Sequence, residues 1–121
     1  MAKKGTVLSG STTSGDLTLG NFIGAVDQWT RMTAEFDCYF MVANLHSLTE
    51  HRDPKALRER TQSFFAQYIA LGLDPAKCSL FVQSMVPEHA ELTWVLTNIA
   101  PLGQLERMTQ FKDKSENKKQ I

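Results

Sequence analysis

Apolar residues along this chain occur both in short continuous runs, typical of buried strands, and in stripes with helical spacing. The first run covers residues 6–8 and ends at Ser9-Gly10, which predicts a short buried strand. Residues 38–43 are apolar without alternation, and this predicts a strand covered on both faces, as in parallel sheets. A third strand is predicted over residues 79–83.

Stripes with helical spacing separate these strands. The first follows Asp16 or Thr18, either of which can cap the helix, and its apolar-face positions are Leu19, Phe22, Ile23, Val26, Trp29 and Thr30. The second begins with Asp53 as N-cap and Pro54 at the first helical position, and it stops at Gly72. Its stripe consists of Leu57, Thr61, Phe64, Phe65, Tyr68 and Leu71.

A third helix is predicted from Pro87, with a break near Pro101 and Gly103 and a last helical piece over residues 105–111. Its apolar positions are Ala90, Trp94, Val95 and Ile99. The resulting order of strand and helix, three times over, predicts an α/β fold with a doubly wound, Rossmann-like parallel sheet and right-handed crossovers. The final letters, SENKKQI, carry no stop signal, so we expect a chain cut within a domain.

Composition narrows the function classes. The 121 residues are 42% hydrophobic, and thirteen basic residues balance thirteen acidic ones, which argues against a strongly basic nucleic-acid binder. The basic residues after Arg107 form either a solvated face or a surface for phosphate or RNA. Cys38 and Cys78 lie in or beside apolar runs and are predicted to be buried, reduced thiols. We predict no metal site, no membrane segment and a cytoplasmic location.

The stretch SGSTTSGDLTLGN, residues 9–21, is the loop between the first strand and the first helix. Ligands of α/β sheets bind beyond the carboxyl ends of strands, where glycines allow close approach and helix N-termini attract anions. This loop therefore predicts a nucleotide or phosphate site, with a plain turn as the alternative. Gly10, Gly15 and Gly20 stand five apart, so the loop is neither GxGxxG nor a Walker loop.

The stretch NLHSLT, residues 44–49, follows the second strand. Asn44 and His46 are therefore expected to face the same crevice as the first loop. The alternative for His46 is a loop histidine whose hydrogen bonds are satisfied by the backbone.

These two stretches, together with LFVQSMVPEHAELTW and GQLERMTQFKDKS, resemble the amino-terminal part of bacterial tryptophanyl-tRNA synthetases over essentially the whole chain. ERMTQFKDKS, residues 106–115, is the most specific of them, and TLGN, residues 18–21, resembles the HIGH signature of class I synthetases. The resemblance implies the first half of a class I catalytic domain. It also implies a dimerising insertion that starts at about residue 85, with the remainder of the enzyme absent from this chain.

The resemblance also implies roles for individual residues. Those expected to bind ATP are Gly10, Thr12, Thr13, Ser14, Thr18, Gly20 and Asn21. Gly20 would leave room for the adenine, while Asn21 and Lys114 would act in catalysis, Lys114 at the phosphates. Those expected to bind tryptophan are Leu8, Ala43, Asn44, His46 and Gln110. Thr12 and Thr13 depart from the glutamine and proline that are common in the family.

The implied activity is ligation of tryptophan to tRNA(Trp) by a homodimer that uses ATP and Mg²⁺. A nucleotidylyltransferase or a tyrosyl-type synthetase is an alternative enzyme. An alternative of another class is a non-catalytic nucleotide-binding or dimerising fragment of the same fold. Trp94 would then lie in an interface, whereas its ordinary interpretation is core packing.

Overall fold

The computed structural model describes residues 3–13, 15–49 and 53–116, without the side chains of residues 114 and 116. The chain forms two compact units, Met1–Val86 and Pro87–Ile121. The dimerising insertion expected from about residue 85 would begin close to the boundary between these two units. Its presence stays a prediction.

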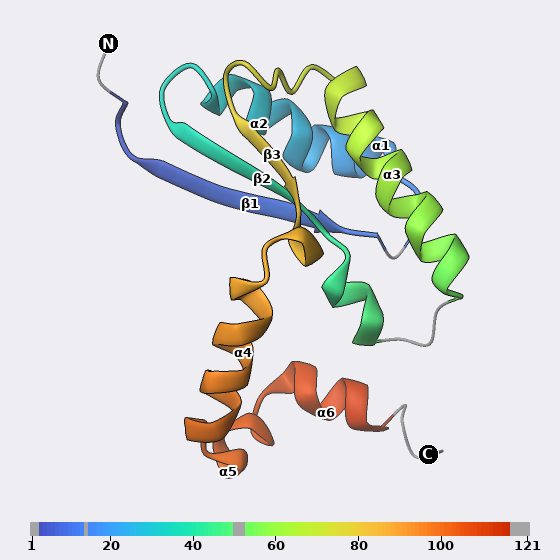
Figure 1. Ribbon diagram of the computed structural model, residues 1–121, viewed down its shortest axis with the longest axis vertical. Coiled ribbons are helices and arrows are strands. Elements are labelled where there is room, and N and C mark those ends of the chain that lie inside the picture. Colours follow the sequence, from blue (N-terminus) through green and yellow to red (C-terminus); the bar gives the residue numbers. More distant parts are fainter. Residues whose placement is uncertain (1–2, 14, 50–52, 117–121) are drawn as a thin grey trace. The chain divides into compact units, whose positions relative to one another are not determined.

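The first unit contains a parallel sheet with the order β1-β2-β3 (Figure 1). The strands are β1 (Thr6–Thr12), β2 (Asp37–Ala43) and β3 (Ser79–Val82). The predicted alternation of strands and helices is confirmed, but β1 continues four residues beyond its predicted end, because Ser9 to Thr12 pair with the apolar second half of β2. Gln83, predicted in the third strand, instead begins a short 3-10 turn, Gln83–Met85.

One continuous helical segment follows β1, made of α1 (Leu19–Asn21), a π-helical turn (Phe22–Val26) and α2 (Asp27–Met32). Of the two candidate N-caps, the structure uses Thr18.

The second helix, α3 (Pro54–Ala70), begins as predicted. The Asp53 carboxylate accepts a hydrogen bond from the backbone N–H of Ala56. Gly72, just beyond the helix, has a φ of 104°, a conformation that favours glycine, and this explains why the helix stops there.

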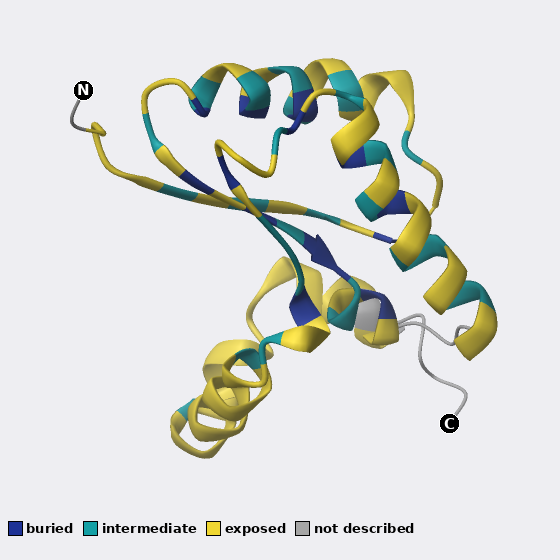
Figure 2. Ribbon diagram, turned by 45° about the horizontal axis from the view of Figure 1, so that its top comes forward, coloured by how far each residue is buried: buried dark blue, intermediate teal, exposed yellow. Residues whose placement is uncertain are grey.

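The core lies between one face of the sheet and the helices α2 and α3. The Trp29 ring stacks on Phe40 of β2 with centroids 5.0 Å apart, and Tyr68 of α3 meets Trp29 edge-on at 5.6 Å. The other fully or nearly fully buried apolar side chains in this cluster are Val26, Cys38, Val42, Phe64, Leu73 and Cys78. Figure 2 shows this buried layer beneath the two helices.

The prediction that β2 is covered on both faces is wrong for this chain. Cys38, Phe40 and Val42 are buried, whereas the alternate residues Asp37 and Tyr39 are exposed and Met41 is partly exposed. The physical reason is that the helices of this unit pack on the same face of the sheet, so no helix among the described residues of the unit covers the opposite face.

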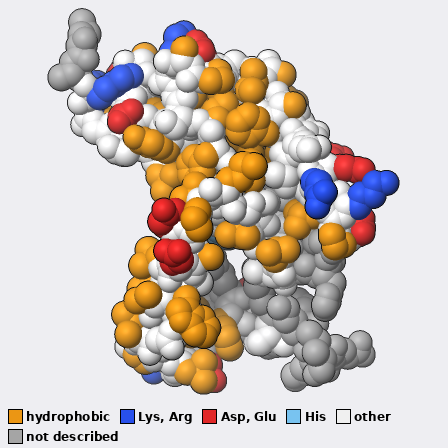
Figure 3. All heavy atoms as spheres, in the orientation of Figure 1, with side chains coloured by type: hydrophobic (Ala, Val, Ile, Leu, Met, Phe, Trp, Pro, Cys, Tyr) orange, Lys and Arg blue, Asp and Glu red, His pale blue; other side chains and the backbone are white. Residues whose placement is uncertain are grey.

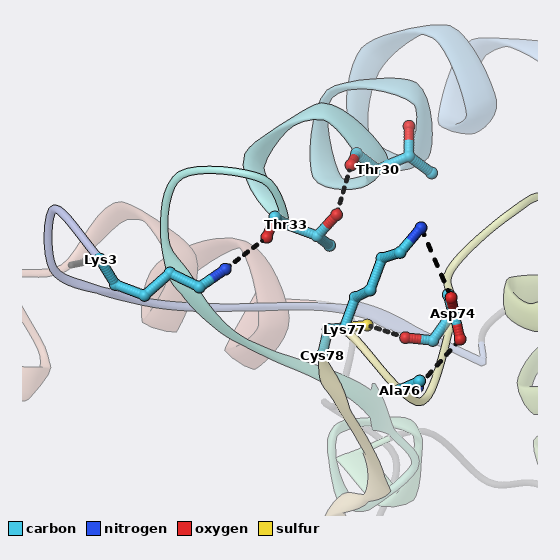
Figure 4. Close-up of polar contacts among 7 residues, drawn as sticks. All are labelled: Lys3, Thr30, Thr33, Asp74, Ala76, Lys77 and Cys78. Carbon is cyan, nitrogen blue, oxygen red and sulfur yellow. Dashed lines mark hydrogen bonds and ion pairs between the residues drawn. The ribbon is translucent and has the colours of Figure 1, made fainter. Parts of the chain in front are cut away.

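The turn before β3 is built around Asp74. Its carboxylate accepts from the backbone N–H of Ala76 at 2.9 Å and pairs with Lys77 at 3.5 Å (Figure 4). The Cys78 thiol donates to the Asp74 carbonyl at 3.3 Å. Cys38 and Cys78 are both free and buried, which confirms their predicted burial, and burial raises the pKa of each.

The second unit consists of α4 (Glu88–Ile99), α5 (Leu102–Leu105) and α6 (Thr109–Glu116). The prediction of one helical piece over residues 105–111 is wrong, because the chain turns between Leu105 and Thr109. Short-range bonds from Arg107 and Met108 back to α5 stabilise this turn.

No residue of α4 is buried, and Trp94 is 71% exposed. The interpretation of Trp94 as a core residue is therefore wrong within the described part of the chain. Figure 3 shows apolar side chains gathered on the surface of this helical unit. Among the described residues, no helix is both long enough and apolar enough to cross a membrane.

Candidate nucleotide-binding site

The polar residues singled out in the sequence gather where the three parallel strands end. Thr12 is the last residue of β1, and the register places it beside Ala43, the last residue of β2. Asn44 follows directly, and Gln83 follows the end of β3. This is the edge at which ligands bind in open α/β sheets.

The uncovered face of the sheet brings several predicted residues together. Residues of β1 alternate between the two faces, so Leu8, Gly10 and Thr12 share the face that the helices leave open. The register pairs Leu8 with Tyr39 there, and Leu8 is 61% exposed. Leu8, which is expected to bind tryptophan, thus lies two residues before Gly10, which is expected to bind ATP, on the same strand.

Gly10 is required by the sheet itself. A Cβ atom built at this position would lie 2.4 Å from the carbonyl oxygen of Met41, closer than a real side chain could approach. The glycine therefore has a structural reason within this chain, and its contact with ATP stays a prediction.

Thr13 lies inside the protein rather than on the open face. Its hydroxyl is 2.8 Å from the hydroxyl of Ser47, and its side chain is 0% exposed. This placement disfavours the expected phosphate contact through the Thr13 hydroxyl, because that hydroxyl already has a buried partner. Thr12 beside it is exposed, and Ser14 lies outside the described residues.

Thr18 and Asn21 form a reciprocal cap at the start of the first helical segment. The Asn21 side-chain oxygen accepts from the backbone N–H of Thr18 at 2.9 Å and from its hydroxyl at 2.8 Å. The Thr18 hydroxyl in turn accepts from the Asn21 backbone N–H at 3.3 Å. This arrangement fixes the first turn and orients Asn21.

Gly20, within the same turn, is exposed, and a Cβ there would meet only the Thr18 hydroxyl at 3.6 Å, an ordinary contact. The described packing therefore does not require a glycine at this position, in contrast to Gly10.

The turn after β2, Leu45–Thr49, is a 3-10 turn that is tied to the end of β3. The His46 Nδ1 atom lies 3.0 Å from the Gln83 side-chain oxygen. Asn44 donates from its amide to the Ser84 hydroxyl at 2.9 Å and accepts from the Ser84 backbone N–H at 3.1 Å. His46 is thus paired with a side chain, so the backbone alternative is not what the structure shows.

Sequence reasoning missed Gln83 and Ser84. Both are polar residues directly after the observed strand β3, and this position after a strand is the signal that identified Asn44. The predicted strand included Gln83, which hid the signal. It also missed the hydroxyl of Tyr68, because the sequence pattern shows this residue only as part of an apolar stripe. That hydroxyl contacts the backbone of both β1 and β2, and burial raises the pKa of Tyr68 to about 12.

Two predicted residues belong to the second unit. Gln110 is an exposed residue of α6, and the side chain of Lys114 lies outside the described residues. Their roles toward tryptophan and ATP stay predictions. The part of the chain that the structure describes contains no group of three or more His, Cys, Asp or Glu residues that could hold a metal ion.

The sheet, the glycine-containing first loop and the capped helix that follows it are the features of a nucleotide-binding α/β fold. The chain belongs to the family described as tRNA synthetases class I (W and Y), whose model matches residues 2–121. Within that family, it is 50% identical over 114 residues to the tryptophan–tRNA ligase of Clostridium perfringens and 47% identical over 115 residues to that of Bacillus anthracis. These alignments cover 94% and 95% of this chain but only 34% and 35% of the relatives, so the chain spans about a third of their length.

Solved structures agree with this assignment. The tryptophanyl-tRNA synthetase of Campylobacter jejuni complexed with ADP and tryptophan matches with a TM-score of 0.86 and 35% identity. The match covers 93% of this chain and 35% of that one. A tyrosyl-tRNA synthetase from Archaeoglobus fulgidus, at 22% identity and a TM-score of 0.71, shares the fold. The predicted fold class and family resemblance are thereby confirmed.

Proposed function

We propose that this chain is the ATP-binding segment of a cytoplasmic tryptophan–tRNA ligase that works as a homodimer. The observation that carries the proposal is the 47–50% identity to tryptophan–tRNA ligases across nearly the whole chain. The similar structure that holds ADP and tryptophan supports it. Two free, buried cysteines suit a reducing compartment.

The proposed reaction has two steps. A carboxylate oxygen of tryptophan attacks the α-phosphorus of ATP, a new O–P bond forms, and the bond to the bridging oxygen breaks as pyrophosphate leaves. The 2′- or 3′-hydroxyl of the terminal tRNA(Trp) nucleotide then attacks the activated carbonyl and AMP leaves. Neither step needs a nucleophile from the protein, so positioning and stabilisation of phosphate charge carry the catalysis.

The residues of this chain would divide that work. On the ATP side, Gly10 and Thr12 lie on the open sheet face. The Thr18–Asn21 cap fixes the first helical turn, in which Gly20 would leave room for the adenine. On the tryptophan side, Leu8 shares the open face, while Ala43, Asn44 and His46 mark the end of β2. Lys114 and Gln110 would act from α6 on the phosphates and on tryptophan, respectively.

Mg²⁺ is proposed to arrive with ATP. Mg²⁺ in nucleotide sites is held largely by the phosphates and by water, with few protein ligands. The ion would neutralise phosphate charge.

A dimerising fragment without catalysis is the second candidate. It is favoured by α4, whose exposed side chains include Leu92, Trp94, Val95 and Ile99. An exposed apolar surface of this kind is typical of a protein interface.

Pyrophosphate exchange separates the candidates. The full-length protein should exchange radiolabelled pyrophosphate into ATP with tryptophan and not with tyrosine, whereas the 121-residue chain alone should be nearly inactive. Exchange that depends on tyrosine would assign the protein to the tyrosine branch of the family. A full-length protein that binds ATP and dimerises without exchange would support the non-catalytic candidate.

A further inference from the structure

Buried polar side chains of the described structure concentrate at the strand ends. One of them is Thr33, whose hydroxyl donates to the Thr30 carbonyl and whose backbone carbonyl accepts from Lys3 (Figure 4); the others are Thr13, Ser47 and Gln83. A buried polar group needs a partner, because leaving it unpaired destabilises the fold. Thr13 and Ser47 supply this partner to each other at 2.8 Å, and Ser47 is only 4% exposed.

This pair joins two segments that are far apart in the sequence. Thr13 directly follows β1 and opens the loop expected at ATP. Ser47 lies in the 3-10 turn after β2, beside His46, and its backbone N–H closes that turn on the Asn44 carbonyl at 3.1 Å. The same turn reaches β3 through the contact of His46 with Gln83.

A hydrogen bond between two buried hydroxyls contributes little net stability. Two apolar side chains of similar shape would fill the space about as well, since both desolvated hydroxyls would disappear together. What the hydroxyl pair adds is direction, because a hydrogen bond constrains distance and angle more tightly than apolar contact does. It therefore fixes the first loop relative to the His46 turn.

We propose that Thr13 and Ser47 form a positioning pair that sets the first loop, with its ATP, at the correct distance from the turn that contacts tryptophan. The inference rests on the proposed function. Neither hydroxyl reaches the open face, so the pair is not catalytic. Alignment matters most in the step in which both substrates react, and small misplacements of reacting groups are costly there. Loss of the pair should therefore lower kcat more than it raises either KM.

The test uses the full-length protein and tryptophan-dependent pyrophosphate exchange. Thr13→Val, which keeps the shape of threonine, and Ser47→Ala should each lower kcat about 10-fold or more, with both KM values within about threefold of wild type. Thr13→Ser, which keeps the hydroxyl, should restore most of kcat. The double variant Thr13→Val/Ser47→Ala should lose less than the product of the two single losses, because both changes remove the same bond.

The matched control is Thr33→Val, which removes a buried hydroxyl that bonds only to the last turn of the adjacent helix α2. It should leave kcat within about twofold. Thermal unfolding of every variant separates loss of fold from loss of alignment. Three outcomes would overturn the inference and leave the proposed function standing. The folded single variants could keep the wild-type kcat, the loss of kcat in the double variant could equal the product of the two single losses, or Thr33→Val could lose as much kcat as they do. A wild-type protein without tryptophan-dependent exchange would instead overturn the proposed function and this inference with it.

Discussion

The hydroxyl of Tyr68 accepts a hydrogen bond from the backbone N–H of Ser11 at 3.1 Å. It also donates to the Met41 carbonyl at 3.3 Å, so one side chain of α3 bridges β1 and β2. Ser11 stands one residue before the end of β1. The bridge therefore holds the strand end from which the first loop departs.

Removing this bridge should destabilise the sheet locally. In Tyr68→Phe the ring remains, but the part-buried N–H of Ser11 and carbonyl of Met41 lose a partner, which should cost about 1–3 kcal/mol of the free energy of unfolding. Urea titration of the full-length protein measures the change. Tyr39→Phe, on the exposed side of β2, is the matched control and should change stability by less than about 0.5 kcal/mol. Equal effects of the two substitutions would contradict this role of the hydroxyl.

Tyr68 should also make stability depend on alkaline pH. Burial raises its pKa from about 10 to about 12, so the folded state keeps a proton that the unfolded chain releases. The stabilisation is fully present below pH 10 and is lost as the pH rises toward 12, by on the order of 2 kcal/mol. The buried thiols of Cys38 and Cys78 act in the same direction. The comparison of wild type with Tyr68→Phe therefore isolates the tyrosine, and parallel curves for the two proteins would contradict the prediction.

Substitution of Gly20 should separate stability from ATP binding. Gly20→Ala should stabilise the first helical segment by about 0.5–1 kcal/mol, because alanine loses less backbone entropy there. It should nevertheless weaken ATP binding, and Gly20→Val should abolish it while the protein stays folded. Calorimetry with ATP and thermal unfolding measure the two effects. Gly24→Ala, also in open space in this segment, is the control and should keep ATP affinity. Unchanged affinity in folded Gly20→Val would remove Gly20 from the site.

Lys114 should act mainly on the transition state. In the full-length protein, Lys114→Ala should slow adenylate formation roughly 100-fold, while the Kd for tryptophan changes little, because the lysine is proposed to meet charge that develops on phosphate. Single-turnover kinetics and tryptophan titration give the two quantities. Lys112→Ala, an exposed lysine of the same helix, should stay within a few-fold of wild type. A similarly small effect of Lys114→Ala would make it an ordinary surface charge.

The 121-residue chain alone should self-associate. Exposed apolar side chains of α4, with Trp94 foremost, would bury surface on association. Sedimentation velocity should show dimers or larger species at micromolar concentration, and Trp94→Ser should shift them toward monomer. Thr93→Ser, on the same helix, should not. A wild-type chain that stays monomeric over that range would show that this apolar surface does not drive association.

The sequence predicted correctly the ends of those helices that carry a capping residue, a proline or a glycine. The two ends of α3 are an example. Asp53 caps the start, the ring of Pro54 suits the first helical position, and the positive φ of Gly72 ends the helix. Each of these effects acts within a few residues of the chain. The end of β1 was missed because pairing with β2 extends the strand through Ser and Thr residues. That pairing is tertiary and leaves no local trace.

In the candidate site, too, local signals were predicted from the sequence and tertiary contacts were not. The strand-end rule located Asn44 and His46, but their partners Gln83 and Ser84 lie 37 and 40 residues away in sequence. The Thr13–Ser47 contact spans 34 residues. No spacing pattern encodes such contacts, because they depend on which strand lies next to which.

The order of the strands in space is also their order along the chain. β2 joins β1, and β3 then joins β2, so each ladder forms with the segment made just before it. Synthesis on the ribosome proceeds from the amino terminus, and domains begin to fold as they emerge. The two crossovers, residues 13–36 and 44–78, can close one after the other, and the entropic cost of closing each grows only slowly with its length. The strand ends that carry the proposed ATP loop and the His46 turn can therefore meet while later parts of the protein are still being translated.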